Sequence, residues 1–459
     1  MSISLAPIHA ALEHPLPLDQ NCFDEVLAKA REKKGLSLRE TALLLSISNP
    51  EWRSALFAEA GKIKDEIYGK RIVLFAPLYT SNRCINDCLY CGFRRANTAL
   101  VRKSLTVEEV RRQAMQLEAM GHKRLLLVAG EHPKEAAATI IAQMVEAIYS
   151  STDIRRLNVN CAPLSIDDFR ILKDAQIGTY QLFQETYHPD TYAYLHPSGP
   201  KADYFNRLTA MDRAMEAGID DVGLGVLFGL YDHPFEILAL LEHARILEDR
   251  YGAGPHTVSV PRLKPAFESA LTTVPYSIDD ETFKQIVAVL RLAIPYTGLI
   301  LSTRESAELR NELLHLGISQ ISAGSSTTPG GYRDGTEQAE DLETKGSQFY
   351  LEDHRSLPEV TLSIMEKGFI PSFCTACYRS GRTGEDFMAL AKTGHIAQMC
   401  DPNALLTLQE YLLDYGDESL QKRGAAVIEQ ALTQLSEEKA ERLRQGMERL
   451  RCGERDIYI

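Results

Sequence analysis

The sequence lacks the features that would place the protein in a membrane or on nucleic acid. No stretch approaches the ~18 apolar residues that a membrane span needs, and the first twenty residues, MSISLAPIHAALEHPLPLDQ, have neither the basic region nor the apolar run of a secretory leader. Basic residues are outnumbered, with 50 Lys+Arg against 63 Asp+Glu and a formal net charge of −13. This balance argues against nucleic acid and anionic membranes as partners. We expect a cytoplasmic protein that binds neither.

Cysteine is also scarce, with nine residues among 459, and the count is odd. In a reducing compartment, close-set cysteines are more often metal ligands or redox groups than structural disulfides. The rest of the composition, 44% hydrophobic and 25% charged, is typical of a globular protein with a large core. The few cysteines therefore raise a question of coordination chemistry.

From about residue 72 the sequence alternates short apolar runs with longer amphipathic stretches. The latter include TVEEVRRQAMQLEAMG, DYFNRLTAMDRAMEAG and PFEILALLEHARILEDRYG, which end at Gly as helices often do. Eight βα units over roughly 250 residues fit an α/β fold of the (β/α)8 TIM-barrel type. A doubly wound open sheet is the alternative, because periodicity alone does not show closure. The eight predicted strands are IVLFAPL (72–78), LLLVAGE (125–131), LNVNCAPL (157–164), TYQLFQE (179–185), VGLGVLFGL (222–230), TVSVPRL (257–263), GLILSTR (298–304) and ISQISAG (318–324).

Three regions are predicted. Residues 1–68 form an N-terminal helical extension, residues 69–335 the barrel, and residues 336–459 a mostly helical C-terminal domain. The Gly-, Thr- and acid-rich stretch TTPGGYRDGTEQAEDLETKGSQ (327–348) reads as a surface loop or linker. Three more cysteines and further helices follow it. The charge run SEEKAERLRQGMERLRCG predicts a solvated helix face.

Three cysteines, Cys84, Cys88 and Cys91, lie within YTSNRCINDCLYCGF, just after the first predicted strand. That places them at the C-terminal mouth of a barrel, where active sites gather. A structural zinc normally takes four protein ligands, whereas three thiolates suit a 4Fe-4S cluster with one open iron. The C-x3-C-x2-C spacing strongly resembles the radical S-adenosylmethionine (radical SAM) superfamily. The resemblance implies that the methionine part of SAM supplies the missing ligand; zinc or unrelated thiols are the alternative.

Other residues at the predicted strand ends match this superfamily. Gly130 and Glu131 close the second strand and resemble its Gly-Glu pair, in which an acidic group receives the methionine ammonium. Gln184 and Glu185, at the end of the fourth strand, are expected either to accept hydrogen bonds from a ribose or to have a loop role.

Three further residues are assigned on the same resemblance. Arg207 is a candidate for the methionine carboxylate, with a surface helix arginine as the alternative. Tyr90 and Phe93 pack either on adenine or on the barrel rim. We favour adenine for Tyr90, because it is tethered beside a cluster ligand.

A second incomplete set is Cys374, Cys377 and Cys400, in FIPSFCTACYRSGRTG and, after 22 residues, HIAQMCDPNALLTLQEYL. A zinc site with His395 as the fourth ligand is one reading. Three thiolates again suit a second 4Fe-4S cluster with an open iron. The Gly- and Arg-containing YRSGRTG either holds a small anion or is only a turn.

These cysteines together with QETYH, DDVGLGVLFGLYD, GPHTVSVPR, LSTRESAELR and ISAGSSTTPGGY resemble the tyrosine lyases of FeFe-hydrogenase maturation, the HydG family, from about residue 70 to 415. The resemblance implies cleavage of the tyrosine Cα–Cβ bond to p-cresol and dehydroglycine. Dehydroglycine then gives carbon monoxide and cyanide on an iron–cysteine complex. Partners would be tyrosine, SAM, a reductant such as ferredoxin or flavodoxin, and hydrogenase maturation proteins.

Two other functions stay open. The tyrosine lyases of thiazole biosynthesis share the barrel motifs and release dehydroglycine, but they lack the second cysteine set. A non-catalytic iron–sulfur carrier is the alternative from another class. Strand-end residues such as Glu131, Gln184 and Arg304 argue against a carrier, since cluster storage needs no amino-acid pocket.

His256 in GPHTVSVPR is the position that matches the family's histidine ligand to an additional iron, which also carries a bound cysteine. Independently, His256 stands at the start of the sixth strand and hence at the N-terminal mouth, opposite Cys84. A lone histidine there is more often structural. If His256 is a ligand, the second cluster lies at the far end of the barrel and an internal passage is needed.

Arg304 and Ser322 end the seventh and eighth predicted strands. Together they are candidates for binding the tyrosine carboxylate, with a charge-assisted bond from the guanidinium. A salt-bridged arginine at a helix start is the competing account of Arg304. Ser325 and Ser326 are nearby alternatives to Ser322.

Overall fold

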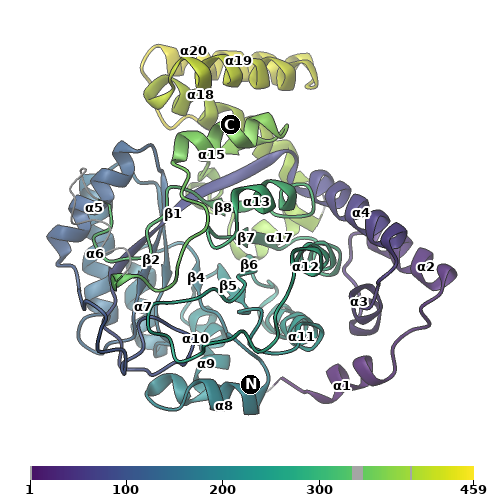
Figure 1. Ribbon diagram of the computed structural model, residues 1–459. Helices are drawn as coiled ribbons and strands as arrows, with labels where there is room; N and C mark the ends of the chain where they lie inside the picture. Colours follow the sequence, from purple (N-terminus) through teal and green to yellow (C-terminus); the bar gives the residue numbers. More distant parts are fainter. Residues whose placement is uncertain (1–2, 333–344, 393–394) are drawn as a thin grey trace.

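The computed structural model describes residues 3–332, 345–392 and 395–459, and only the backbone of His395. All its strand pairings between named strands are parallel and belong to one sheet, in the order β2-β3-β4-β5-β6-β7-β8-β1-β9. β1 also pairs with β2, so the first eight strands close into a barrel (Figure 1). The strands are β1 Arg71–Ser81, β2 Arg124–Ala129, β3 Arg156–Asn160, β4 Tyr180–Gln181, β5 Val222–Gly225, β6 Thr257–Ser259, β7 Gly298–Leu301, β8 Gln320–Ser322 and β9 Ile370–Ser372.

Helices follow the strands around the outside of the barrel, as the sequence predicted. Their starts carry the expected caps: Thr106 and Glu109 form a capping box on α5, and Asp279 accepts from the N–H of Thr282 on α12. The barrel helices are α5 Val107–Ala119, α6 Ala138–Ser151, α7 Ile166–Asp174, α8 Pro189–Leu195, the 3-10 turn η1 Pro200–Ala202, α9 Tyr204–Leu208, α10 Ala210–Glu216, α11 His233–Tyr251, α12 Asp280–Ala293 and α13 Ala307–Leu313.

Most predicted strands are shorter in the structure: β5, predicted over 222–230, ends at Gly225, and β6, predicted over 257–263, ends at Ser259. Two elements differ most. The stretch 203–218 is not one helix but two, because Thr209 interrupts it and its hydroxyl donates to the carbonyl of Phe205 at 2.8 Å. The predicted fourth strand, 179–185, has only two residues of regular strand. Its continuation still bonds to the next strand, since the N–H of Gln184 donates to the carbonyl of Gly225 at 3.0 Å.

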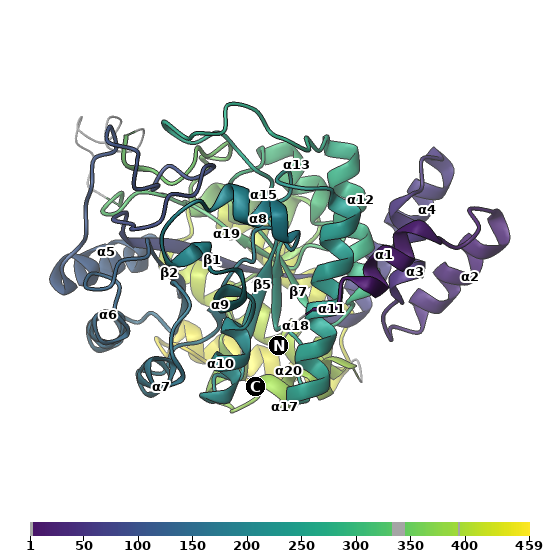
Figure 2. The ribbon, with the colours of Figure 1, turned by 90° about the horizontal axis from the view of Figure 1, so that it is seen from below.

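Four helices precede the barrel and lie along one side of it, where α1 contacts α11 and α4 contacts α12 (Figure 2). They confirm the helical character predicted for this region. Their bounds are α1 Ala6–Glu13, α2 Gln20–Arg31, α3 Leu38–Leu45 and α4 Pro50–Tyr68.

The C-terminal region is mostly helical, as predicted, but it begins with elements that the sequence did not reveal. Residues 333–344 of the predicted surface loop lie outside the described residues, and Thr327, Thr328 and Tyr332 at its start are buried, not at the surface. Helix α15 and strand β9 follow, and β9 pairs with the start of β1, so this region adds a strand to the barrel sheet. The predicted boundary at 335/336 lies outside the described residues. The helices are α15 Leu357–Glu366, α16 Ala376–Arg379, α17 Gly384–Lys392, α18 His395–Tyr415, α19 Glu418–Thr433 and α20 Glu437–Arg451.

The last helices share an apolar core of their own, which includes Leu405, Leu408, Leu443 and Leu450. Figure 1 shows α18, α19 and α20 stacked together beyond the barrel. Among the described helices, none is long and apolar enough to cross a membrane.

Candidate active site and second cysteine site

Two cavities occupy the two ends of the barrel, and β1 runs through both. Side chains alternate along a strand, so every second residue of β1 points into the barrel. Arg71 and Val73 line the cavity at the N-terminal mouth, and Phe75, Pro77 and Tyr79 line the one at the C-terminal mouth. We call these the lower and the upper cavity.

The upper cavity encloses about 1430 Å³ of non-protein space, including its opening to solvent. Cys84, Cys88 and Cys91 all line it, as predicted for the loop after the first strand. Burial raises the pKa of Cys88 to about 11 and that of Cys91 to about 12. Without a metal these thiols are neutral, so a bound cation would have to displace their protons.

The turn at Gly130, just past β2, packs directly against the cysteine loop. A Cβ at Gly130 would lie 2.6 Å from the carbonyl oxygen of Arg83 and 3.3 Å from the Cβ of Cys84. The backbone of Glu131 holds the same loop, since its carbonyl accepts from the N–H of Ile85 at 2.9 Å. Glycine is therefore required at 130 by close approach.

Asn86 links the cysteine loop to the predicted acidic residue. Its Nδ2 donates to Glu131 Oε2 at 2.5 Å and lies 3.7 Å from the Sγ of Cys84. Asn86 is 2% exposed, and its Oδ1 accepts from the N–H of Lys201. Glu131 thus faces the cavity from a fixed position beside the cysteine set.

Glu185 forms the second polar group on the wall. It lies in the left-handed region at φ +72°, which is costly for a residue with a side chain. Its Oε1 lies 2.7 Å from Lys201 Nζ and 3.3 Å from Arg207 Nη2. Burial alone would raise the pKa of Glu185, but the two cations outweigh it and hold the pKa below its usual value. Arg207 is buried, so the alternative of a surface helix arginine is wrong.

Both aromatic residues of the cysteine loop line the upper cavity, and the adenine contact assigned to Tyr90 stays a prediction. Tyr90 lines the upper cavity and its hydroxyl bonds to His196 Nε2 at 2.9 Å. Phe93 also lines the cavity and meets Tyr79 edge to face. Gln184 is not among the lining residues: its Nε2 is buried without a hydrogen-bond partner, and the ribose contact assigned to it stays a prediction.

Arg304, in the loop that follows β7, and Ser322, at the end of β8, both line the upper cavity. The guanidinium of Arg304 stacks on the ring of Phe349, and no ion pair to it occurs within residues 3–332, 345–392 and 395–459. Burial lowers the pKa of Arg304. The competing account of a salt-bridged arginine is therefore not supported, and the cation faces a cavity.

The second cysteine set lines the lower cavity. Cys374 comes from the turn after β9, Cys377 from α16 and Cys400 from α18. His256 lies on the same wall at the start of β6. The N-terminal placement predicted for His256 agrees with this geometry. His395, the fourth ligand of the zinc alternative, has no described side chain.

Guanidinium groups surround these thiols. Arg124 donates to the carbonyl of Cys374 at 2.9 Å, and Arg71 and Arg382 line the cavity. The hydrogen bond with Cys400, followed by the charges of Arg71 and Arg382, lowers the pKa of Cys377 to about 6. Burial raises the pKa of Cys374, and the hydrogen bond to Cys377 raises that of Cys400, so Cys377 is the one thiol of this set for which the anionic form is favoured.

His256 has one carboxylate neighbour. Its Nδ1 lies 3.5 Å from Asp221 Oδ1, which also accepts from the N–H of Gly384 at 3.0 Å. Its ring packs on Phe387, and burial lowers the pKa of His256. A neutral imidazole is the form that binds metals.

Each donor set offers three thiols to a cavity, which is compatible with a cluster that takes one thiolate per iron. In the described part of the chain, no three His, Cys, Asp or Glu side chains converge as ligands of one metal ion would. In a cubane cluster each thiolate binds a different iron, so its ligands are spread over a wall. All nine cysteines are free thiols, and each set of three faces a cavity.

Several lining residues escaped prediction. Asn86 stands between the cysteines of CINDC and was the most accessible to sequence reasoning, while Lys201 lies in a loop with no motif. Arg71 and Asp221 line the lower cavity, but no local motif marks them, because only the three-dimensional fold brings them there.

Comparison with known proteins agrees with this architecture. The Radical SAM superfamily profile matches residues 78–244, and the Biotin and Thiamin Synthesis associated domain matches residues 259–370. A crystal structure of HydG, a maturase of the [FeFe]-hydrogenase, is 48% identical with a TM-score of 0.95 and covers 100% of this chain and 99% of that chain. This chain belongs to the HydG family.

A second HydG structure supports the assignment, and the chain is also similar to an enzyme with a different name. HydG from Carboxydothermus hydrogenoformans is 44% identical, with a TM-score of 0.83 and 96% coverage of both chains. The 2-iminoacetate synthase of Escherichia coli (strain K12) is 33% identical over 345 residues, 75% of this chain and 88% of its own. Membership of the radical SAM superfamily implies a 4Fe-4S cluster and SAM. The upper cavity of this HydG-family protein, which Cys84, Cys88 and Cys91 line, suits both.

Proposed function

We propose that this HydG-family protein cleaves the Cα–Cβ bond of tyrosine to p-cresol and dehydroglycine, which it converts to carbon monoxide and cyanide on an iron–cysteine complex for hydrogenase maturation. The observation that carries the proposal is the separation of two cysteine sets, in cavities at opposite ends of one barrel. Cleavage belongs to the upper cavity and assembly to the lower one.

In the upper cavity, Cys84, Cys88 and Cys91 would hold a 4Fe-4S cluster. When bound, that cluster would supply the electron that cleaves SAM. Glu131 and Arg207 offer opposite charges to the ammonium and carboxylate of SAM, and Tyr90 offers a ring face to adenine. Asn86 holds Glu131 beside Cys84, so the ammonium would be fixed next to the cysteine set.

Tyrosine would bind deeper in the same cavity. Arg304 carries a charge without a described partner and is fixed by stacking on Phe349. A tyrosine carboxylate would supply the missing anion, with Ser322 as a second donor. The apolar side chains of Phe75, Leu126 and Ile300 exclude water from the pocket. Binding would thus orient the amino group toward the cysteine loop.

The second stage belongs to the lower cavity. Cys374, Cys377 and Cys400 would hold a second cluster, and His256 would bind the additional iron that carries cysteine. The name of the Escherichia coli relative supports the first product, because 2-iminoacetate is another name for dehydroglycine. The nine cysteines of the chain are free thiols, which is compatible with a reducing cytoplasm. A ferredoxin or flavodoxin there would be a suitable reductant.

One pair of variants tests both stages. Replacing Cys374 and Cys377 by Ala should leave p-cresol formation largely in place, since cleavage uses the other cavity, and should eliminate the iron-bound carbonyl. His256→Ala should also lose the carbonyl but keep its second cluster. The readouts are p-cresol by chromatography, bound carbon monoxide by infrared spectroscopy and iron content.

Other outcomes would favour the alternatives. An iron carbonyl from the double cysteine variant would show that the lower cavity does not build the product, and a thiazole-type lyase would regain support. A carrier would yield no 5′-deoxyadenosine with SAM and reductant. Iron analysis separates two cubane clusters, at about eight irons, from one cluster plus zinc.

A further inference from the structure

The last six residues of the sequence, Glu454–Ile459, run back along α18. The side chain of Asn403 bonds both ways to Ile459: its Oδ1 accepts from the N–H at 2.8 Å, and its Nδ2 donates to the carbonyl at 2.9 Å. Seven residues later, Glu410 Oε2 accepts from the N–H of Asp456 at 2.8 Å. Seven residues are about two helical turns, so both contacts lie on one face of α18. Ile457 is buried in the C-terminal core.

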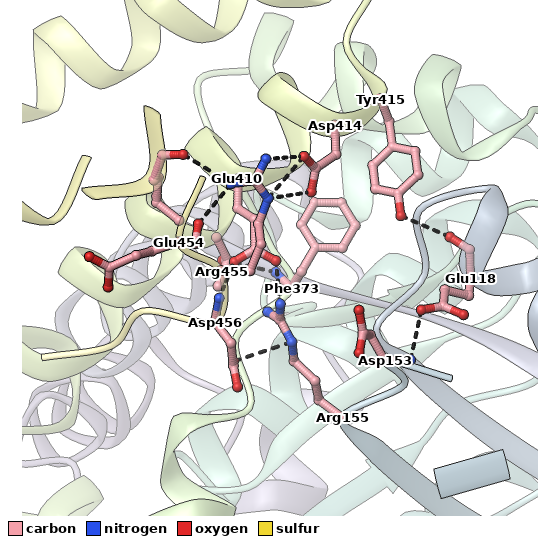
Figure 3. Close-up of polar contacts among 12 residues, drawn as sticks. Glu118, Asp153, Arg155, Phe373, Glu410, Asp414, Tyr415, Glu454, Arg455 and Asp456 are labelled. Carbon is pink, nitrogen blue, oxygen red and sulfur yellow. Dashed lines mark hydrogen bonds and ion pairs between the residues drawn. The ribbon is translucent and has the colours of Figure 1, made fainter. Parts of the chain in front are cut away.

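Asp456 connects this segment to two further elements. Its Oδ1 lies 3.2 Å from Nε of Arg155, the residue just before β3, as Figure 3 shows. Its other oxygen pairs with Arg379 at the end of α16. Arg155 also pairs with Glu410, and these two side chains are 7% and 5% exposed. A buried pair such as Arg155–Glu410 is costly to break from one side, whereas the Asp456 and Arg379 side chains are partly exposed, at 34% and 28%. The barrel, α16 and α18 therefore meet at Asp456 and Glu410.

These elements are the ones that carry the second cysteine set. Arg379 follows Cys377 by two residues, and Asn403 follows Cys400 by three. Cys377 and Cys400 are separated by 22 intervening residues that include α17. Their distance is therefore set by how α16 and α18 are held, not by local chain geometry.

The backbone conformation of Asp456 indicates that contacts with neighbouring residues hold Glu454–Ile459 in place. Its φ is +61°, a left-handed conformation that Asp and Asn tolerate better than other residues with side chains. Such a conformation persists only when neighbouring contacts hold it. Here those contacts are Glu410 on the N–H and two arginines on the carboxylate.

We propose that Glu454–Ile459 is an intramolecular clasp, with Asp456 as a positioning residue, that holds α16 and α18 at the spacing which Cys377 and Cys400 need to bind the second cluster. The inference rests on the proposed function, because it assumes a cluster at these thiols. The clasp acts only on the lower cavity. The upper cavity takes no lining residue from α16, α18 or the clasp, so we expect it to be unaffected when the clasp is removed.

Two point variants isolate the clasp. Asp456→Asn removes the charge and keeps a residue that tolerates the left-handed backbone, and Arg379→Gln removes the partner on α16. The matched control is Arg444→Gln, which breaks exposed ion pairs to Glu437 and Glu441 within α20. A chain that ends at Gly453 removes the whole clasp. If that shortened chain does not fold, the point variants still provide the test.

The first readout needs no metal. In the metal-free protein, alkylation of Cys377 and Cys400, followed by mass spectrometry with exposed Cys452 as the internal reference, should be several-fold faster in both point variants than in the control. After reconstitution, iron should fall from about eight per chain toward about four. The second cluster's electron paramagnetic resonance signal should weaken, and p-cresol formation should stay unchanged.

Unchanged alkylation and iron in Asp456→Asn and Arg379→Gln would overturn the clasp. Equal loss of both clusters would also overturn it, because a general loss of stability, not positioning of one site, would be the cause. If the unaltered protein binds only about four irons, the proposed second cluster is wrong. The alkylation rates then still decide whether the clasp sets the thiol geometry.

Discussion

The guanidinium carbon of Arg304 lies 3.4 Å from the centre of the Phe349 ring, on the wall of the upper cavity. A stacked guanidinium cannot swing away to solvent, and its side chain has no ion pair within the described ranges. The protein thus keeps a positive charge fixed in a largely enclosed pocket. An anionic substrate group is the simplest partner for it.

Arg304→Ala should weaken tyrosine binding by about 2–5 kcal/mol, the usual loss when one partner of a buried charged pair is removed. Calorimetric titration with tyrosine in the presence of SAM measures this. Arg170→Ala on exposed α7 is the control and should change nothing. An unaltered tyrosine affinity in the Arg304 variant would remove this residue from the substrate site.

Cys84→Ser should abolish formation of 5′-deoxyadenosine, because the upper site would lose a cluster ligand. Iron should fall by about four atoms per chain, leaving the lower cluster in place. The same substitution at exposed Cys452 is the control and should keep full activity. Normal SAM cleavage by the Cys84 variant, followed by chromatography, would contradict the assignment.

Gly130→Ala should selectively damage the upper site. The new Cβ would lie 2.6 Å from the carbonyl oxygen of Arg83, so the cysteine loop must move. We expect iron at the upper site and 5′-deoxyadenosine to fall together, with the second cluster's spectrum retained. Gly254→Ala is the matched control, since its Cβ would meet only ordinary contacts at 3.7 Å. Equal behaviour of the two variants would count against close approach as the cause.

Glu236 should make stability depend on pH. Burial raises its pKa from the usual 4.5 to about 8, while its carboxyl accepts from the N–H of Tyr187 at 2.8 Å. The folded state therefore holds a proton that the unfolded state releases above pH 4.5. The stability this proton contributes is fully present below pH 4.5 and is lost as pH rises through about 8.

Glu236→Gln, which imitates the protonated acid, should therefore gain stability relative to the unaltered protein by about 1.4 kcal/mol per pH unit across that window. Urea unfolding of the metal-free protein at several pH values measures the difference. A difference between the two proteins that stays constant with pH would mean that Glu236 is not protonated in the fold.

The sequence determined the local chemistry of this protein. Cys84, Cys88 and Cys91 lie within one loop, so their spacing alone brings them to the mouth of the barrel. The alternation of strands and helices, with His256 at a strand start, determined which end each set would occupy. Ser322 was found because it ends a strand, where the parallel sheet directs the chain to the C-terminal mouth. Arg304 was found because the loop after a barrel strand opens at the same mouth.

The sequence could not predict which way side chains point in segments without regular secondary structure. Gln184 was expected in the upper cavity, but regular pairing of β4 ends at Gln181, and past that point alternation no longer fixes which way a side chain points. Lys201 reaches Glu185 from a loop without periodicity. Neither placement follows from pattern alone.

Only the tertiary structure decided which segments far apart in the sequence come into contact. The pairing of β1 with β2 closes the barrel, and β9 joins the same sheet. Cys400 meets Cys377 because α18 and α16 are packed against the barrel, and Asp456 ties both to Arg155. Local patterns specify neighbours a few residues apart, whereas these contacts depend on the mutual burial of elements tens to hundreds of residues apart, which no local spacing encodes.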